Sequence, residues 1–371
     1  MSIAIITLPI LYSGINPLSN LIDVLLELSG HIYLITGNEG NAFKDKQGIN
    51  CYGFTINFAD TKPRIIFNYL LIQLYTSIGL IKIIKKIDVI FFYFGEADIL
   101  PMVLAKLFRR KVIIVLGGDL SLSGKLQRSP LAKITSAICN LSLSLTDRII
   151  VYSKRAIKDQ GLEIYKEKIL VTHKHFLNFD KFYIINRLGE RDNVVGYIGR
   201  LSAEKGIVNF LDAAIKLSQK NPDIKFLIIG DGDMRIIVEN SLKNHNNFGE
   251  RVTLTGWISH DEIPYYLNKM KLIVLPSFTE GLPNVMLESM ACGTPVLVTE
   301  VGAVPDVIRD GETGFIMESN SPECIEYHIM RSLTSPHIDG VVKEARLLVE
   351  NEFNYQHTVE LFENAVGEIF R

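Results

Sequence analysis

Short apolar runs alternate with longer amphipathic stretches along most of the chain. Ten of these runs are rich in β-branched residues and predict strands at residues 3–8, 31–35, 89–93, 112–116, 148–152, 193–198, 225–229, 251–255, 272–275 and 295–298. Uninterrupted apolar runs are typical of parallel strands that are buried on both faces, and the segments between them are long enough for crossover helices. The pattern therefore predicts an α/β protein built from doubly wound parallel sheets.

The number of strands also indicates how many domains there are. Ten strands are too many for one small domain, and 371 residues are typical of two. The periodicity is lost at residues 180–192, just before a fresh strand, so we expect one Rossmann-like domain over 1–185 and another over 186–352. Sheets of this kind bind ligands at the carboxyl ends of their strands, which predicts a ligand cleft between the two domains.

The charge of the chain changes sign between the two predicted domains. The formal net charge of the whole chain is −2, which is too close to neutral for a protein that coats nucleic acid. Residues 1–185 carry 22 Lys and Arg against 14 Asp and Glu, a net +8, whereas 186–371 carry 17 against 27, a net −10. We expect the two halves to face different partners.

The cysteines and the N-terminus both favour a cytoplasmic protein. Cys51, Cys139, Cys292 and Cys324 show no paired spacing, which argues against a disulfide framework or a thiolate zinc site. The first residues are apolar without the basic leader of a signal peptide, and they predict a buried strand.

One segment, residues 65–81, is nearly apolar enough to cross a membrane. It contains Asn68, Gln73, Thr76 and Ser77, and it is shorter than the roughly 20 apolar residues that a span requires. A buried or interfacial helix is the favoured interpretation, with a transmembrane helix as the alternative.

A loop that holds two cations follows the strand at 193–198. Gly199 and Gly206 bound this loop, and Arg200 and Lys205 lie within it. A planar guanidinium and a compact ammonium at the carboxyl end of a strand can bind a diphosphate. The alternative is a solvated turn in which Lys205 pairs with Glu204 or with nothing.

Two weaker signals follow the next strands. Gly230 and Gly232 supply two glycines of a dinucleotide-binding fingerprint, but Arg235 stands where the third belongs, so a tight turn explains them equally well. Trp257, the only tryptophan, is followed by Ile258 and could form a wall for a nucleobase; a core aromatic is the more common outcome.

The most informative segment is 276–295. A strand ends at residue 275, a polar loop follows, and Pro283 is well placed as the first residue of a helix that Gly293 ends. The amides at the start of such a helix favour an anion. Glu280 and Glu288 could accept hydrogen bonds from two parts of one sugar-bearing ligand. The alternative makes Glu280 a partner of the helix dipole and Glu288 a surface charge.

Taken together, these motifs resemble glycosyltransferase family 4, among the glycosyl transferases group 1. The resemblance rests on Gly-Arg-Leu at 199–201, Glu-Lys-Gly at 204–206, Gly-Asp-Gly at 230–232, Ser-Phe-Thr-Glu-Gly-Leu-Pro at 277–283 with a second glutamate at 288, Gly-Thr-Pro-Val at 293–296 and Gly-Glu-Thr-Gly-Phe at 311–315. It covers roughly residues 193–316. It implies retaining enzymes that use nucleotide sugars and have the GT-B fold of two Rossmann-like domains facing across a cleft. It further implies a C-terminal helix, within 353–371, that packs back on the first domain.

The resemblance also implies roles for individual residues. Arg200 and Lys205 would neutralise the diphosphate of the leaving group, and Glu280 would hold the sugar beside them; these three would be the catalytic residues. Glu288 would hold the ribose. The rest of the predicted donor site is Gly14, Gly199, Gly230, Trp257, Ile258, Gly281, Leu282, Pro283, Asn284 and Val285. The resemblance also implies catalysis without a metal, since Arg200 and Lys205 would supply the positive charge, and the nucleotide-diphosphate sugar would be a substrate without any cofactor.

The first domain departs from the family pattern. Many members carry a histidine in the loop after the fourth strand, where this chain reads Gly-Gly-Asp-Leu-Ser at 117–121. Asp119 is the candidate to take the place of that histidine beside the sugar or the acceptor. Cations beside apolar helices favour contact with an anionic membrane, with an ordinary solvated face as the alternative; they are Lys82, Lys85, Lys86, Lys106, Arg109, Arg110 and Lys111.

The sequence therefore predicts a retaining, metal-independent glycosyltransferase of surface-glycan biosynthesis. Its partners would be a nucleotide sugar, a saccharide or lipid-linked saccharide acceptor and the inner face of a membrane, but no nucleic acid. Two alternatives stay open: a catalytically silent subunit that binds nucleotide sugars, and an epimerase or phosphorylase with the GT-B fold.

Overall fold

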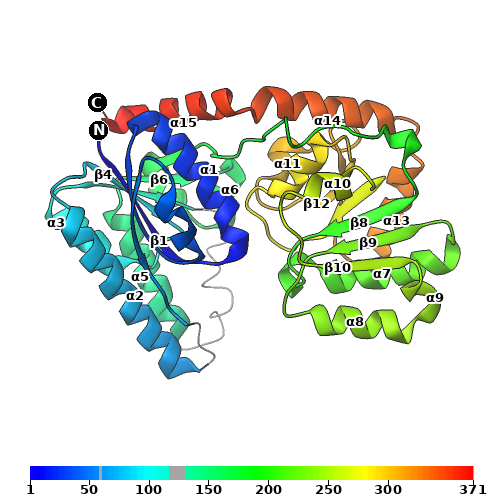
Figure 1. The fold of residues 1–371 in the computed structure, drawn as a ribbon, viewed down its shortest axis with the longest axis horizontal. Helices are drawn as coiled ribbons and strands as arrows, with labels where there is room; N and C mark the ends of the chain where they lie inside the picture. The colour runs from blue at the N-terminus through cyan, green and yellow to red at the C-terminus, as the bar shows by residue number, and fades with distance from the viewer. Residues whose placement is uncertain (58–60, 117–130, 371) are drawn as a thin grey trace. The chain divides into compact units, whose positions relative to one another are not determined.

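The computed structural model describes residues 1–57, 61–116 and 131–370. The chain divides into two compact units, the first formed by residues 1–175 with 358–371 and the second by 176–357. Each unit is built around one fully parallel sheet with helices on both faces (Figure 1). The predicted α/β class with doubly wound parallel sheets is confirmed.

The first sheet has seven strands in the order β3-β2-β1-β4-β5-β6-β7. These are β1 (Ile3–Ile10), β2 (Ile32–Asn38), β3 (Ile49–Phe54), β4 (Val89–Tyr93), β5 (Lys111–Val115), β6 (Arg148–Val151) and β7 (Ile169–Val171). The helices are α1 (Tyr12–Ser29), α2 (Lys62–Ile83), α3 (Ile99–Leu107), α5 (Leu131–Leu145), α6 (Lys154–Asp159) and α15 (Tyr355–Phe370), with 3₁₀ helices η1 (Glu39–Asp45) and η2 (Glu163–Lys168). One hydrophobic cluster joins α2, α3 and α5 to the sheet, so these three helices cover the same face.

The second sheet has six strands in the order β10-β9-β8-β11-β12-β13. These are β8 (Val194–Ile198), β9 (Lys225–Ile229), β10 (Val252–Gly256), β11 (Leu272–Leu275), β12 (Val296–Thr299) and β13 (Phe315–Met317). The helices are α7 (Ile207–Lys220), α8 (Arg235–Asn244), α9 (Asn246–Gly249), α10 (Ile263–Leu267), α11 (Asn284–Ala291), α12 (Val304–Val307), α13 (Pro322–Leu333) and α14 (Ile338–Glu352), with 3₁₀ helices η3 (Leu188–Glu190) and η4 (Ala203–Lys205). The side chains of α7 and α13 pack into one core with the strands.

All ten predicted strands are present, with ends that differ from the prediction by at most three residues. The last helix, α15, belongs to the first unit from residue 358 onward. Its Phe362 is fully buried, with its ring centroid 6.3 Å from that of Phe91 in β4, and the Thr358 hydroxyl donates to the carbonyl of His175 at 2.9 Å. Aromatic burial and a buried hydrogen bond therefore fix the end of the chain on the first sheet.

The charged segment 180–192 is packed on the second unit. The Arg191 guanidinium is buried and donates to the carbonyl oxygens of Met270 at 2.9 Å and Cys292 at 2.8 Å, and to the Thr294 hydroxyl at 2.8 Å. The amide of Ile185 donates to Asn268 Oδ1 at 2.7 Å. The compact units separate between residues 175 and 176, before this segment begins.

A buried lysine lies just before that boundary. Lys174 is 1% exposed, and its Nζ lies 5.2 Å from the ring centroid of Tyr93 and 5.6 Å from that of Tyr152. Burial lowers the pKa of Lys174 from 10.5 to about 7. A buried ammonium beside two aromatic rings is costly to the folded state.

We expect Lys174→Met to stabilise the protein, and more so at pH 6 than at pH 9. The unfolded chain binds the lysine proton more tightly than the folded protein between pH 7 and 10.5, so the wild type gains stability as the pH rises through that window. Below pH 7 the full free-energy cost of burying the ammonium is present, and removing it should raise the free energy of unfolding by about 1–4 kcal/mol. Urea unfolding at the two pH values measures the difference, with the exposed Lys154→Met as control. Equal destabilisation by Lys174→Met at both pH values would show that the ammonium has a stabilising partner.

Candidate donor site

The predicted donor residues lie in loops at the carboxyl edge of the second sheet. From β8 the chain winds through β9 to β10 on one side, and it then returns to β11 on the other side of β8. The loops that follow β8 and β11 therefore flank the topological switch point, where ligands of doubly wound sheets bind. These loops contain Gly199–Gly206 and Pro276–Pro283.

Glycines allow these loops to approach one another closely. Gly206 has φ +70°, and a Cβ there would lie 2.0 Å from the carbonyl oxygen of Pro276. Gly230 has φ +134°, and a Cβ there would lie 1.9 Å from the carbonyl oxygen of Gly199. No other residue fits at either position without moving the backbone. Gly230 therefore allows the ends of β8 and β9 to pack closely. This agrees with the tight turn that the sequence analysis gave as the alternative to a dinucleotide-binding fingerprint.

An ion pair joins the two loops across the switch point. Lys205 Nζ lies 2.6 Å from Glu280 Oε1, and the Ser277 hydroxyl donates to the same oxygen at 2.7 Å. The Lys205 side chain is 27% exposed and that of Glu280 is 12% exposed, so both are held while remaining in reach of a ligand. Lys205 thus pairs with Glu280, a contact that neither the diphosphate-binding nor the solvated-turn interpretation of that loop predicted.

Arg200 is held much more loosely. Its side chain is 49% exposed and lies 3.3 Å from Glu204 Oε1 in a solvated pair. Its backbone is fixed, because the buried Tyr197 hydroxyl donates to the Arg200 carbonyl at 2.8 Å. A long cation on a fixed backbone can exchange a weak surface partner for a stronger anion at little cost.

Glu288 is buried and belongs to a charged network. It lies in the second turn of α11, and its Oε1 is 2.7 Å from His260 Nε2. On the other side of that ring, His260 Nδ1 is 3.0 Å from Lys181 Nζ, which also lies 2.7 Å from Asp261 Oδ1. The ammonium can only donate, so Nδ1 accepts and the imidazole donates from Nε2 to Glu288. The alternative that made Glu288 a surface charge is wrong.

Sequence reasoning missed His260 and Lys181. They stand 79 residues apart, and neither belongs to a recognisable spacing. The available signal was the position of His260, four residues after the end of a parallel strand, where the loops of the site gather.

The remaining predicted donor residues surround the same edge. Pro283 is the N-cap of α11 and not its first residue. In the part of the chain that the structure describes, no side chain caps this helix, so its first amides are available to a ligand. Leu282 and Pro283 are buried and anchor the loop, while Gly281, Asn284 and Val285 are partly exposed. Trp257 is 65% exposed, with the partly exposed Ile258 after it, which rules out the core position.

Two predicted residues lie elsewhere. Gly14 belongs to the first unit and lies in the first turn of α1, not in a loop, with its amide donating to the carbonyl of Leu11 at 2.8 Å. Asp119 lies outside the described residues.

The switch point of the first sheet, between β1 and β4, holds two carboxyl groups that sequence reasoning missed. Glu96 and Asp98 follow β4 and are 6% and 0% exposed. Burial raises the pKa of Asp98 to about 7, although a hydrogen bond from Gln73 at 2.8 Å opposes the rise. Burial likewise raises the pKa of Glu96. Buried acids with raised pKa values at the carboxyl edge of a sheet are candidates for contacts with substrate hydroxyls.

Among the described residues, the atoms of Glu318, Cys324 and His328 lie close enough together to share a metal ion. His328 Nε2 is 2.7 Å from Glu318 Oε2, and the Arg331 guanidinium lies 3.3 Å from Nδ1 of the same ring. The ring therefore accepts at Nδ1 and donates at Nε2, so Nε2 has no lone pair for a metal. The group is an internal hydrogen-bond network.

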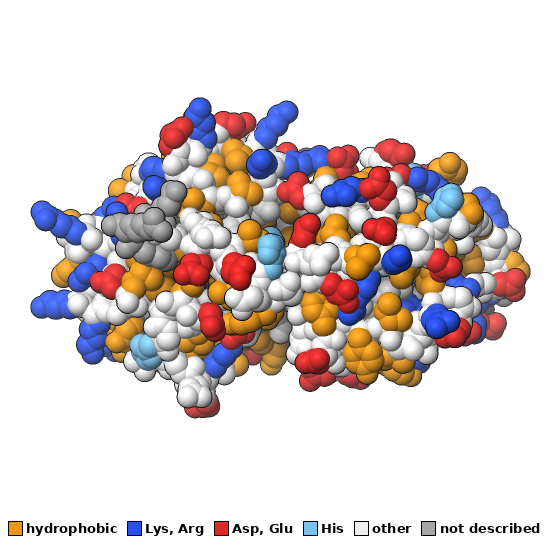
Figure 2. Space-filling model, turned by 90° about the horizontal axis from the view of Figure 1, so that it is seen from above, with side chains coloured by type: hydrophobic (Ala, Val, Ile, Leu, Met, Phe, Trp, Pro, Cys, Tyr) orange, Lys and Arg blue, Asp and Glu red, His pale blue; other side chains and the backbone are white. Residues whose placement is uncertain are grey.

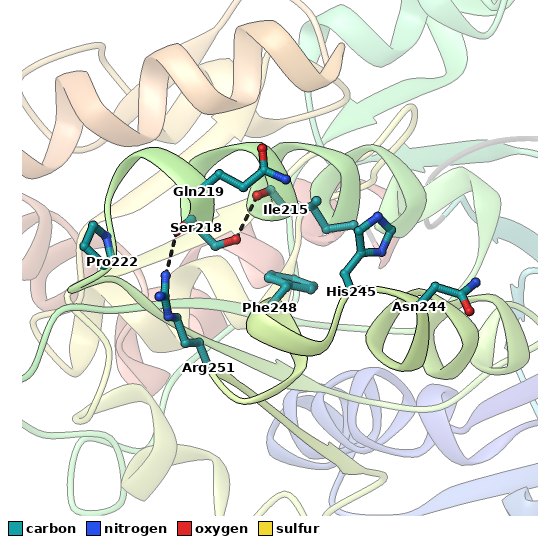
Figure 3. A pocket seen from close by; sticks show the side chains of 8 residues that line it. All are labelled: Ile215, Ser218, Gln219, Pro222, Asn244, His245, Phe248 and Arg251. Atoms are coloured by element: carbon teal, nitrogen blue, oxygen red, sulfur yellow. Dashed lines mark hydrogen bonds between the residues drawn. The ribbon is translucent and has the colours of Figure 1, made fainter.

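A hollow of about 470 Å³ lies on the second unit between α7, α9 and the start of β10 (Figure 3). Two of its polar side chains already bond to protein, since Arg251 Nη1 donates to the carbonyl of Ser218 at 2.6 Å and the Ser218 hydroxyl donates to that of Ile215 at 2.8 Å. Arg251 precedes β10, so the hollow lies at the amino edge of the sheet, opposite the loops of the donor site.

Two parallel Rossmann-like sheets define the class, the GT-B fold. Anabaena HepE in complex with UDP superposes with a TM-score of 0.79 at 17% identity, over 99% of this chain and 100% of that one. Sucrose-phosphate synthase of Thermosynechococcus elongatus gives a TM-score of 0.78 at 18% identity, over 100% and 99%. The predicted GT-B fold is confirmed.

Within that class, residues 179–352 match the family "Glycosyl transferases group 1", so the second unit contains a domain of this family, as predicted. The capsular polysaccharide biosynthesis glycosyltransferase CapM of Staphylococcus aureus is 31% identical over 189 residues, 48% of this chain and 49% of its own. The alpha-D-kanosaminyltransferase of Streptomyces kanamyceticus is 39% identical over 124 residues, 33% and 32% of the two chains. The chain thus spans a third to just over half the length of such relatives.

Proposed function

We propose that this protein is a retaining glycosyltransferase of family 4 that moves a sugar from a nucleotide-diphosphate sugar to a saccharide or lipid-linked saccharide. The observation that carries the proposal is the Lys205–Glu280 pair across the switch point of a group 1 glycosyltransferase domain. One relative, CapM, is named for capsular polysaccharide biosynthesis, which supports a role in surface-glycan assembly.

The cations of the loop after β8 act on the leaving group. As the bond between the sugar and the diphosphate breaks, negative charge grows on the diphosphate oxygens, and fixed positive charge stabilises that transition state. Lys205 supplies this charge from a half-buried position, and Arg200 can swing from Glu204 onto the diphosphate. The open amides of α11 add to the same field. The reaction as proposed needs no metal ion or other cofactor.

The two glutamates orient the donor. Glu280, held by Lys205 and Ser277, accepts hydrogen bonds from the sugar hydroxyls together with the backbone of residues 281–284. Glu288 accepts from the ribose hydroxyls, and Trp257 and Ile258 line the place of the base. Gly14, in the first turn of α1, is proposed as a further contact of the donor phosphates.

The acceptor binds the first unit. The buried carboxyl groups of Glu96 and Asp98 at its switch point support this side of the proposal, with Asp119 as a further contact. The unit works at the cytoplasmic face of an anionic membrane that carries the lipid-linked acceptor.

Release of nucleotide from a panel of nucleotide sugars tests this function, with and without saccharide and lipid-linked acceptors. We expect one donor to be turned over, faster with acceptor, to a product that keeps the anomeric configuration of the donor. Binding of donors without any turnover would instead support a silent binding subunit. Conversion of the donor sugar without transfer would support an epimerase.

We expect His260→Ala to raise the KM for the donor about fivefold to tenfold with little change in kcat. The imidazole fixes Glu288 through one charge-assisted hydrogen bond, whose loss is worth about 1–1.5 kcal/mol in ribose binding. The effect should vanish with a donor that has 2′,3′-dideoxyribose, and His260→Gln should restore part of the affinity. His245→Ala, an exposed histidine at the end of α8, is the control. An equal loss with both donors would make His260 merely structural.

A further inference from the structure

Helix α2 is unusual for a helix that covers a sheet, because several of its polar side chains face inward and several of its apolar side chains face outward. Gln73, Thr76 and Ser77 are 4%, 0% and 4% exposed, while Phe67 and Leu70 are each 59% exposed. Five of the exposed apolar side chains of α2 form a stripe at helical spacing; they are Phe67, Leu70, Leu74, Ile78 and Ile81. We call this set the α2 stripe.

The inner face of α2 is tied to the protein. Gln73 donates from Nε2 to the carbonyl of Ala97 at 3.2 Å and accepts from the amide of Leu100 at 2.9 Å. Leu80 and Ile83, near its end, belong to the core of the first unit. The segment Pro63–Ile83 is long and apolar enough to cross a membrane, but crossing would strip away these contacts. The helix is therefore built to lie along an apolar medium, not to pass through it.

A second apolar row lies next to the α2 stripe. Helix α3 packs against α2, and its Leu100, Val103 and Leu107 are 44%, 36% and 72% exposed at helical spacing, followed by Phe108 at 44%. Large exposed apolar patches are rare on monomers and mark contact with a membrane or another protein, and two packed helices that each expose an apolar row indicate such a surface.

The charges around the two helices select between those partners. Residues 61–87 and 99–116 contain no Asp or Glu, whereas they contain five and four Lys or Arg respectively. Apart from Arg64 at the start of α2, the exposed cations described on these segments lie at the C-terminal ends of the two helices. Lys82 lies in the last turn of α2, Lys85 and Lys86 follow it, and Arg109 and Lys111 follow α3. In Figure 2, Lys and Arg side chains stand among hydrophobic ones at the left end of the first unit, the end where α3 lies in Figure 1.

We propose that the α2 stripe, with the adjoining row on α3, inserts into the interface of an anionic membrane while the cations at the ends of both helices bind lipid phosphates. An apolar face beside a one-signed basic border matches an anionic bilayer, which offers hydrocarbon and negative charge together. A second copy of the chain fits less well, because self-association through this patch would bring like charges together. The proposal rests on the proposed function only in naming the membrane as the place of the acceptor.

Flotation with lipid vesicles tests the surface directly. The wild type should float with vesicles of phosphatidylcholine and phosphatidylglycerol, and much less with phosphatidylcholine alone. Leu70→Ser/Leu74→Ser/Ile78→Ser should lower the vesicle-bound fraction at least tenfold, and Lys82→Glu/Lys85→Glu/Lys86→Glu should remove the part that depends on anionic lipid and on salt. Ile236→Ser/Ile237→Ser, which changes exposed apolar residues on α8 of the second unit, should float like the wild type.

Three results would overturn the proposal. They are a wild type that ignores anionic vesicles, a serine variant that floats as well as the wild type, and a wild-type dimer that the serine variant turns into monomers. Thermal unfolding of each variant checks its fold, since all the changed side chains are exposed. Turnover of the donor with a water-soluble acceptor separates the two proposals. We expect this turnover to be equal in all variants. If the wild type shows no turnover but flotation follows the pattern above, the proposed function fails and the membrane surface stands.

Discussion

Lys205→Ala is expected to lower the turnover of the nucleotide sugar by roughly 10²–10³-fold, the cost of losing one preorganised charge from a transition state. The ammonium contacts Glu280 at 2.6 Å across the switch point, so the change removes both the charge on the diphosphate and the link that orients the sugar-binding carboxylate. The loss should appear mainly in kcat, because negative charge on the diphosphate grows as the bond breaks. Steady-state kinetics with the accepted donor measure it.

The matched control is Lys216→Ala. Lys216 on α7 of the same unit also pairs with a glutamate, Glu323 at 2.5 Å, but on the exposed outer side. Its loss should leave kcat unchanged, because solvated ion pairs contribute little. Near-normal turnover by Lys205→Ala would refute the role given to this lysine; a variant that is inactive because it is unfolded would show itself in its circular dichroism spectrum.

Arg191→Ala is expected to destabilise the second unit by roughly 2–5 kcal/mol. The guanidinium donates to the carbonyls of Asn186, Met270 and Cys292, and its loss leaves the last two without this donor. The cost of burying the guanidinium, which lowers the pKa of Arg191 to about 10, offsets part of this loss. Because Arg191 also contacts Thr294, the defect should spread from the segment 183–192 toward the start of β12.

Hydrogen exchange followed by mass spectrometry localises this effect better than a global melting curve, since a two-unit chain need not unfold in one step. Arg187→Ala is the control, because Arg187 is an exposed arginine four residues earlier and surface changes stay within about 0.5 kcal/mol. Unchanged exchange in 183–192 after Arg191→Ala would show that other contacts hold the segment.

The strands that the sequence did not reveal share one property, their place at a sheet edge. β3 and β7 are the two edges of the first sheet, and β13 is an edge of the second. A central strand is covered on both faces and reads as a continuous apolar run, whereas the side chains of β3 and β7 are partly exposed. Their patterns are therefore mixed, and only pairing with a neighbour makes them strands.

The segment 180–192 shows a further limit of local composition. A run of charged residues is typical of a linker, and local composition carries no trace of the acceptors that a buried arginine finds about 80 to 100 residues away. α2 shows the same limit, since its apolar stretch predicted a buried or interfacial helix and could not tell which of its faces is covered.

The sequence by itself determined the parallel α/β fold, the group 1 glycosyltransferase domain and most of the candidate donor residues. Apolar runs, loop glycines and spaced charges are local features, so they can be recognised in the sequence alone. Only the tertiary structure decided that Lys205 pairs with Glu280, that His260 and Lys181 stand behind Glu288, and that α2 turns its apolar side outward. Each of these depends on contacts between residues 25 to 79 positions apart, which the chain brings together only by burying its cores.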